Sequence, residues 1–142
     1  MVEYKTVSSG MRAADIMVKT AEVEIIEATT VCPGKYMVLI SGELSAVRAS
    51  VDAAAAKMPD MLIDKFVLGN PHDSIFTALY GTTDIGSPNA LGVLETFSSC
   101  AAIVAADIAA KTYTGGAHTC CARRDGIMYA PPRTQLHDAQ AR

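Results

Sequence analysis

The sequence predicts an α+β sandwich, in which helices cover one side of a four-stranded antiparallel or mixed sheet. Three observations predict this fold class. Strand-like and helix-like segments alternate in the order β-α-β-β-α-β-α over roughly the first 80 residues. Half of the 142 residues are apolar and only 19% are charged, a composition that favours a compact core over disorder. The opening strand and helix also return later in the chain.

The first strand and helix are expected within residues 2–20. Residues 2–7 have the character of a short strand. Ser8 or Ser9 is placed to cap the helix that follows, and its apolar residues recur every three or four positions, which predicts one buried face. That face consists of Met11, Ala14, Met17 and Val18.

A β-hairpin is expected next. Residues 22–32 begin with alternating polarity and are rich in β-branched side chains, as is typical of a strand. Pro33 and Gly34 interrupt this segment, and residues 35–40 resume it as KYMVLI. The pattern predicts two strands joined by a short turn.

The remaining elements of the first module follow in order. Ser41-Gly42-Glu43 opens a helix that runs to about Ala56, and residues 61–68 (MLIDKFVL) form a strand. Asn70-Pro71 predicts the start of a short helix that ends at Leu79, because proline suits the first turn of a helix.

The sequence of residues 2–20 recurs in similar form, without gaps, as residues 94–112. The matched positions include charged residues, so that Asp15 falls on Asp107 and Lys19 on Lys111, and helix propensity alone does not explain the match. A repeat of this length is typical of a small domain used twice. We therefore expect a complete domain over residues 2–80, a linker over 81–89 and the start of a second domain over 90–112.

The similarity between the copies ends at Thr112. Residues 1–112 contain eight Lys+Arg and thirteen Asp+Glu, whereas residues 113–142 contain four Arg and two Asp. This change of composition predicts an unmatched, irregular tail over 113–142. It suggests that the second domain is truncated or frameshifted after about residue 112.

Cys32 lies in the most distinctive local motif, TTVCPGKY. It has two interpretations. It is a small buried apolar residue at the end of a strand, or it is a metal-binding thiolate whose ionised form Lys35 favours. A single cysteine can ligate an iron–sulfur cluster only if a symmetry axis brings several copies together.

Other polar motifs give weaker signals. Asp15/Lys19 and Asp107/Lys111 are i,i+4 pairs, which are either solvated surface pairs or lysines at a subunit edge. We interpret His72 as a partly exposed structural residue. The cluster of His118, Cys120 and Cys121 lacks the spacing of a zinc site.

The sequence gives little support for catalysis, for nucleic-acid binding or for membrane insertion. It has no phosphate-binding glycine loop and no nucleophile–base arrangement at a known spacing. The first 112 residues carry no basic stripe, and no apolar stretch approaches the roughly 20 residues that cross a bilayer. The N-terminus lacks the features of a signal peptide, so a cytoplasmic location is expected.

Three segments of residues 2–112 are distinctive when taken together: LGVLETFSSCAAIVAADIAAKT, ADIMVKTAEVEIIEATTVCPGKYMVLISGELSAVRASVDAA and MLIDKFVLGNPHDSIFTAL. In these segments the chain resembles bacterial microcompartment shell proteins. The tandem-domain, trimer-forming subfamily fits best, and within it the iron–sulfur members of propanediol-utilisation compartments.

The resemblance implies a structural role in a microcompartment shell in the bacterial cytoplasm, together with other shell proteins. Such chains form trimers that mimic a hexagonal tile with a pore on the threefold axis. By this resemblance, Cys32 from three copies would hold a [4Fe–4S] cluster for electron or cluster transfer, and Pro33, Gly34 and Lys35 would complete the pore loop. Lys19 and Lys111 would lie at the tile edge. The alternative is a small ligand-binding or regulatory α+β oligomer in which Cys32 is purely structural.

Overall fold

The computed structural model describes residues 1–82, 92–112, 118–122 and 126–130. These residues form two compact units. The first contains Met1–Gly69 together with Ser98–Cys100, and the second contains the other described residues from Asn70 onward. Residues 70–80, which the sequence assigned to the first domain, therefore group with the second unit. Most of the expected linker, 81–89, lies outside the described residues.

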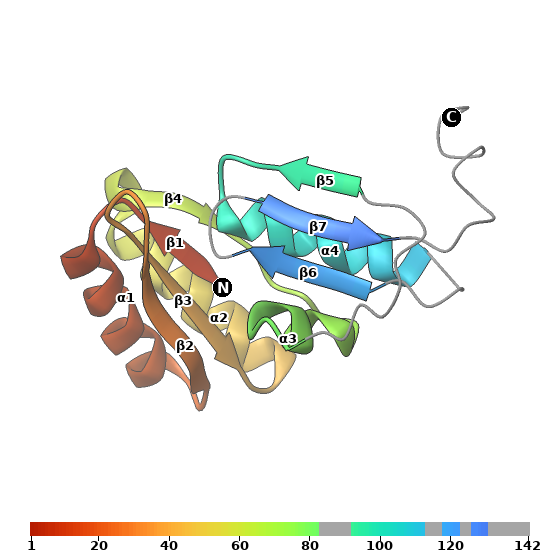
Figure 1. Cartoon of the computed structure of the whole chain (residues 1–142). Helices are drawn as coiled ribbons and strands as arrows, with labels where there is room; N and C mark the ends of the chain where they lie inside the picture. The colour runs from red at the N-terminus through yellow and green to blue at the C-terminus, as the bar shows by residue number, and fades with distance from the viewer. Residues whose placement is uncertain (83–91, 113–117, 123–125, 131–142) are drawn as a thin grey trace. The chain divides into compact units, whose positions relative to one another are not determined.

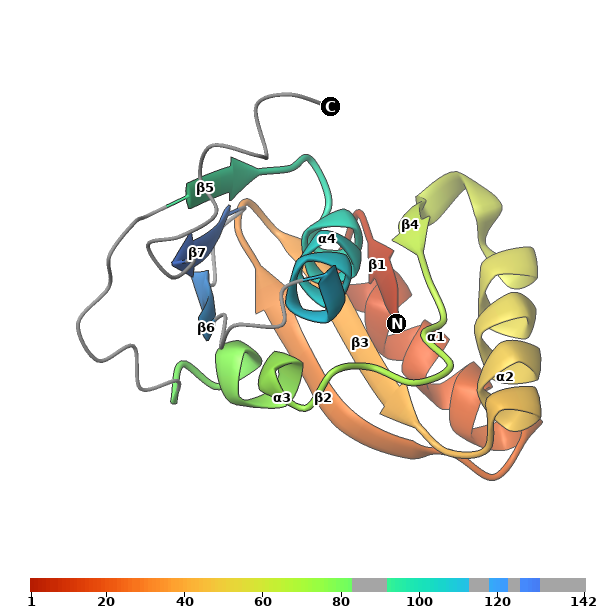
Figure 2. The same cartoon turned by 90° about the vertical axis from the view of Figure 1, so that its right-hand side faces the viewer.

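The first unit is built on a four-stranded antiparallel sheet, which confirms the predicted fold class. The strand order is β2-β3-β1-β4. Helices α1 and α2 lie on the same face of this sheet (Figures 1 and 2). The elements are β1 (Val2–Tyr4), α1 (Val7–Thr20), β2 (Glu24–Val31), β3 (Lys35–Ser41), α2 (Leu44–Lys57), a 3-10 turn (Pro59–Met61) and β4 (Leu62–Lys65).

The core of this unit lies between the central strands and the two helices. Successive side chains of a strand point to opposite faces of its sheet. Val2 and Tyr4 of β1 therefore point the same way, and both are fully buried in the core. Glu3, between them, points to the other face and is also fully buried. The other buried members of the core are Ala13, Met17, Val38, Ile40, Val47, Val51 and Ala54.

Helix α1 starts earlier than predicted. Its cap is Thr6, whose Oγ1 accepts the backbone N–H of Ser9 at 3.3 Å, and not Ser8 or Ser9. The hydroxyl of Ser9 instead donates to the carbonyl of Thr6 at 2.9 Å. Both serines are thus inside the first turn of the helix.

The predicted buried face of α1 is only partly correct. Met17 is buried, but Met11 is 60% exposed and Val18 is 43% exposed. The side that packs on the sheet contains Gly10 and Ala13 instead. A Cβ on Gly10 would lie 2.4 Å from Cδ1 of Tyr36, so the absence of a side chain lets the helix approach β3. Close backbone packing therefore decided the orientation of α1, and the stripe of largest apolar residues did not.

Helix α3 (Ser74–Leu79) starts later than the Asn70-Pro71 signal predicted. The backbone groups of this signal are used elsewhere. The carbonyl of Asn70 accepts a hydrogen bond from Lys111, and the N–H of His72 donates to Asp107. Because these groups make contacts distant in sequence, the helix begins only after Asp73.

The second unit contains a three-stranded antiparallel sheet of order β5-β7-β6. Its elements are β5 (Gly92–Glu95), α4 (Ser99–Thr112), β6 (His118–Ala122) and β7 (Gly126–Ala130), beside α3. The order matches β1-β3-β2 of the first sheet, but the register differs: Glu3 is opposite Met37, whereas Glu95 is opposite Gly126.

The expectation of an irregular tail is therefore wrong for β6 and β7. Both segments carry residues that favour strands, such as Thr119, Ile127 and Tyr129. Pairing with β5 gives their backbone groups partners, which a sequence comparison with the first copy does not detect. The remaining tail residues lie outside the described part of the chain. Among the described residues, no helix has the length and apolar character needed to cross a membrane.

We predict that Gly10→Ala destabilises the first unit by about 1–3 kcal/mol, because the added Cβ would overlap the Tyr36 ring. Chemical denaturation measures this loss. Gly69→Ala is the control, because its Cβ would meet Leu44 at an ordinary 3.6 Å. Equal stability of the two variants would show that Gly10 is not needed for the packing of α1.

Candidate functional site at the β2–β3 loop

The motif around Cys32 forms the tip of the β2–β3 hairpin. Val31 and Lys35 are the last paired residues, so Cys32, Pro33 and Gly34 make the connection. The N–H of Gly34 donates to the carbonyl of Val31 at 3.1 Å. The φ of Gly34 is +105°, which other residues rarely adopt. Glycine is therefore required here by the backbone and not by lack of space, since a Cβ would meet no atom within 4 Å.

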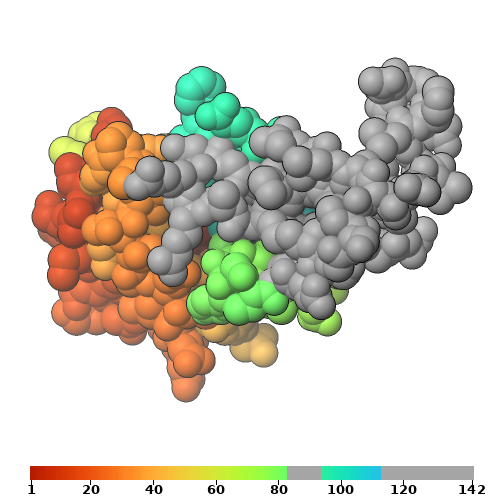
Figure 3. Space-filling model, in the orientation of Figure 1, coloured from red at the N-terminus to blue at the C-terminus, as the bar shows by residue number. Residues whose placement is uncertain are grey.

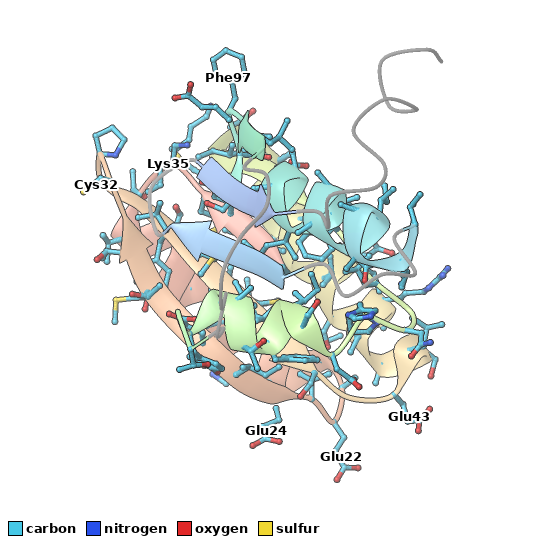
Figure 4. The ribbon with its side chains drawn as sticks, turned by 45° about the vertical axis from the view of Figure 1, so that its right-hand side comes forward. Glu22, Glu24, Cys32, Lys35, Glu43 and Phe97 are labelled. Atoms are coloured by element: carbon cyan, nitrogen blue, oxygen red, sulfur yellow. The ribbon has the colours of Figure 1, made fainter. Side chains whose placement is uncertain are left out.

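Cys32 is exposed at this tip. Figure 4 shows it at the outer end of the hairpin. Its exposure contradicts the interpretation of Cys32 as a small residue packed in the core of this chain. The thiol is instead open to a ligand or to another molecule.

Lys35 does not lie free beside the thiol. Its Nζ is 3.3 Å from Oε1 of Glu3, and its side chain is only 21% exposed. Glu3 is fully buried, and its Oε2 also accepts the backbone N–H of Ser99 at 2.8 Å. Because Ser99 is the first residue of α4, this carboxylate faces the positive end of a helix. Glu3 thus binds both Lys35, at the base of the Cys32 loop, and Ser99, at the start of α4.

Glu3 is the site residue that the sequence analysis missed. Two signals could have identified it. It alternates with Val2 and Tyr4 in a strand, which predicts a carboxylate on the opposite face. It also recurs as Glu95 in the repeat. The repeated position differs in the structure, however, because Glu95 is exposed.

A second thiol lies near this carboxylate but has a different character. Cys100 is 1% exposed. Burial raises the pKa of its thiol, and the negative charges of Asp64 and Glu3 raise that pKa further. The Cys100 thiol therefore stays protonated near neutral pH. Since the thiolate is the form that binds metals, Cys100 is a poor ligand.

The described residues contain no group of three or more His, Cys, Asp or Glu side chains that could hold a metal ion. Within this part of the chain, Cys32 can thus supply one metal ligand and no complete site. His118, Cys120 and Cys121 all lie in β6, but their side chains are outside what the structure describes.

The two predicted edge lysines occupy different environments. Lys19 pairs with Asp15 at 2.6 Å, and their side chains are 72% and 57% exposed. Lys111 pairs with Asp107 at 2.6 Å, but this aspartate is only 5% exposed. Lys111 also donates to the carbonyl of Asn70 at 2.5 Å. Lys111 therefore has a contact within the second unit, whereas Lys19 is on an open surface.

His72, which the sequence analysis interpreted as a partly exposed structural residue, is exposed and forms hydrogen bonds in the segment before α3. Its backbone N–H donates to Oδ1 of Asp107 at 2.8 Å. Its ring Nδ1 is 2.8 Å from the hydroxyl of Ser74 and accepts the Ser74 N–H at 3.2 Å, which orders the turn before α3.

Comparison with known families explains this architecture. The family model described as "BMC domain" matches residues 1–71, which is half of the chain and nearly all of the first unit. This chain belongs to the BMC-domain family.

Proteins similar to this BMC-domain chain are named as shell proteins. The bacterial microcompartment shell protein PduT of Citrobacter freundii is 36% identical over 111 residues, which are 78% of this chain and 60% of PduT. The carboxysome shell protein CsoS1 of Prochlorococcus marinus strain SARG is 35% identical over 65% of this chain and 86% of its own length.

A solved structure supports the same assignment. The crystal structure of a microcompartment protein from Desulfitobacterium hafniense DCB has a TM-score of 0.70 and 39% identity. The match covers 90% of this BMC-domain chain and 73% of that chain. It therefore extends beyond residues 1–71, which the family model matches.

We predict that Glu3→Gln destabilises the protein by about 1–3 kcal/mol, because Lys35 and Ser99 lose a buried charged acceptor. Thermal and denaturant unfolding measure this loss. The control is Glu95→Gln at the repeated, exposed position, where we expect a change within about 0.5 kcal/mol. Similar effects of both changes would contradict the anchoring role of Glu3.

Proposed function

We propose that this chain is a structural shell protein of a bacterial microcompartment and not an enzyme. The observation that carries the proposal is the BMC domain over residues 1–71, together with relatives that are named as shell proteins. Its location would be the microcompartment shell in the bacterial cytoplasm, where its partners would be further copies and other shell proteins.

The second unit supports a tandem arrangement of two BMC domains. Its three strands have the order of the corresponding strands in the first sheet, and α4 repeats the sequence of α1. We propose that three such chains form one tile. The match spans 60% of the length of PduT.

Cys32 is the residue with which such a tile could bind a cluster. The loop fits one part of a shared [4Fe–4S] site, because its thiol is exposed and Gly34 permits the tight turn. Thiolates are the usual ligands of these clusters. Since one chain offers one exposed thiol in its described part, three copies around an axis would have to contribute. The cluster would give the shell a one-electron carrier at its pore.

The ion pair between Glu3 and Lys35 determines the charge at the base of the Cys32 loop. The ammonium of Lys35 is bound to a buried carboxylate, so its charge is neutralised at the base of the loop. The proposed pore would thus be lined by the exposed Cys32, Pro33 and Gly34, with Lys35 behind them.

We predict that Cys32→Ser abolishes iron binding after anaerobic reconstitution, while the fold and the oligomeric state remain. The exposed side chain contributes little to packing, so stability should be unchanged. Iron and sulfide analysis with visible absorption is the measurement. Cys100→Ala is the control and should retain iron, because its thiol is buried and protonated. Stoichiometric iron in the Cys32→Ser protein, or none in the wild type, would refute the cluster.

We predict that Lys19→Ala weakens the formation of extended protein sheets but leaves the melting temperature nearly unchanged. An exposed ion pair contributes at most about 1 kcal/mol to stability, whereas a lattice repeats each contact many times. Electron microscopy of the overproduced protein tests the shell role and the lysine together. Lys65→Ala removes another exposed 2.6 Å pair, with Asp52, and should leave the sheets intact.

A further inference from the structure

Strand β2 is the longer edge strand of the first sheet. The strand order β2-β3-β1-β4 places β2 and β4 at the edges, and among the described residues β2 pairs with β3 alone. An edge strand carries N–H and C=O groups that can pair with a strand of another molecule. Five of the eight residues of β2 are β-branched, and the strand contains no proline. Its composition therefore favours the addition of a further strand unless other features prevent it.

The β2–β3 hairpin lies at the surface of the first unit, where such a strand could reach it. Figure 3 shows the atoms of this hairpin, in orange, at the surface of the molecule. Three features of β2 oppose pairing with another strand. They are a side chain that occupies one of its backbone carbonyls, an irregular register and a set of negative charges.

The side chain that occupies a carbonyl of β2 is Tyr36, from the neighbouring strand β3. Its hydroxyl donates to the carbonyl of Ala28 at 3.2 Å, in an exposed position. Tyr36 is paired with Thr30, so its ring reaches diagonally along β2 to bind a residue two positions away. The ring is held in place because it packs against Gly10 and the core. An incoming strand that uses this carbonyl has to displace the hydroxyl.

The register between β2 and β3 is irregular near the start of β2. Ile25 is opposite Ile40 and Glu27 is opposite Leu39, so Ile26 is an extra residue without a partner on β3. Such a bulge bends the strand and increases its local twist. A bent, twisted edge fits a regular incoming strand poorly.

The negative charges come from glutamates in and just before β2. Residues 21–31 contain Glu22, Glu24 and Glu27 but no Lys or Arg. Glu22 and Glu24 are exposed, and Figure 4 shows both at the end of β2 that lies away from Cys32. A second copy of β2 would bring charges of the same sign to this edge and remove carboxylates from water, which is unfavourable.

The opposite edge of the sheet has features of the same kind. Strand β4 has only four residues, and short edge strands offer few groups for pairing. The backbone N–H of Lys65 in this strand donates to Oδ1 of Asp64 at 2.8 Å. Both edges thus have a backbone group that is bound by a side chain of the same unit.

We infer that Tyr36, the bulge at Ile26 and the glutamates of β2 close this edge of the sheet, so that β2 of a second copy cannot pair with it. The excluded partner is a β-strand of the same chain, because its composition is otherwise suited to the contact. Contacts between copies are then left to side-chain surfaces and do not use backbone pairing at β2. The inference does not depend on the proposed shell role, since it concerns the single chain.

Removing the hydroxyl and one charge should open the edge. Tyr36→Phe keeps the ring beside Gly10 and frees the carbonyl of Ala28, and Glu24→Val replaces a carboxylate with a β-branched side chain. Together they should strengthen self-association through β2 about tenfold or more, because both favour strand pairing. Sedimentation of the full chain over a range of concentrations measures this association. Thioflavin T fluorescence detects stacked β-strands, and hydrogen exchange of residues 24–31 shows whether β2 becomes protected.

The matched control makes the same two chemical changes elsewhere in the first unit, as Tyr4→Phe with Glu43→Val. The Tyr4 hydroxyl is buried and has no hydrogen-bond partner in the described part of the chain. Glu43 is exposed and precedes α2, outside any strand. This control should leave association and thioflavin T fluorescence unchanged. Circular dichroism checks that each variant is folded.

Two further variants separate charge from the loss of the hydroxyl. Tyr36→Phe with Glu24→Lys retains a charge at the edge and should associate less than Tyr36→Phe with Glu24→Val. Glu24→Val alone is the variant to use if Tyr36→Phe unfolds the first unit, because Glu24 is exposed. It should strengthen association in the same direction.

The inference is wrong if Tyr36→Phe with Glu24→Val associates no more than the wild type, or if the control pair shows an equal gain. Thioflavin T fluorescence of the wild type at the level of this variant would also overturn it, because the edge would then be open already. The shell role is tested separately by electron microscopy and is unaffected by either result.

Discussion

The two faces of β1 determine how the rest of the first unit is arranged. Val2 and Tyr4 point into the core beneath α1 and α2, and Glu3 points to the opposite face. A buried carboxylate is costly unless it has partners. Glu3 obtains them from Lys35, at the base of the Cys32 loop, and from Ser99, at the start of α4. One buried charge in a three-residue strand thus fixes two segments that are far apart in sequence.

Helix α1 shows how close packing determines which surface remains for other molecules. Gly10 lets the helix approach Tyr36, and this contact turns Met11 and Val18 outward. An apolar stripe at a protein surface is suited to contacts with other molecules. The same geometry that stabilises the first unit therefore leaves Met11 and Val18 exposed, beside the Asp15–Lys19 pair.

The second unit shows that topology can persist where sequence similarity has ended. The segments 118–122 and 126–130 share no residue pattern with β2 and β3, yet they take the same positions in the strand order. Strand pairing depends on backbone groups and on a general preference for β-branched and aromatic residues. Many sequences meet these conditions. The register also differs between the two sheets, since Glu95 is opposite Gly126 whereas Glu3 is opposite Met37. The side chains that set the register are different in the two sheets.

The sequence by itself determined the order of elements from β1 to β4, a sheet that is antiparallel or mixed, the repeat of α1 in α4 and the turn at Cys32-Pro33-Gly34. These features follow from local periodicity and turn residues, which act over a few positions. Tertiary structure alone decided which face of α1 is buried, that Lys35 binds Glu3, and that Lys111 binds Asn70 while Lys19 remains exposed. These outcomes depend on contacts between residues far apart in the chain. Identical residues in the two copies therefore acquired different roles, because their surroundings differ.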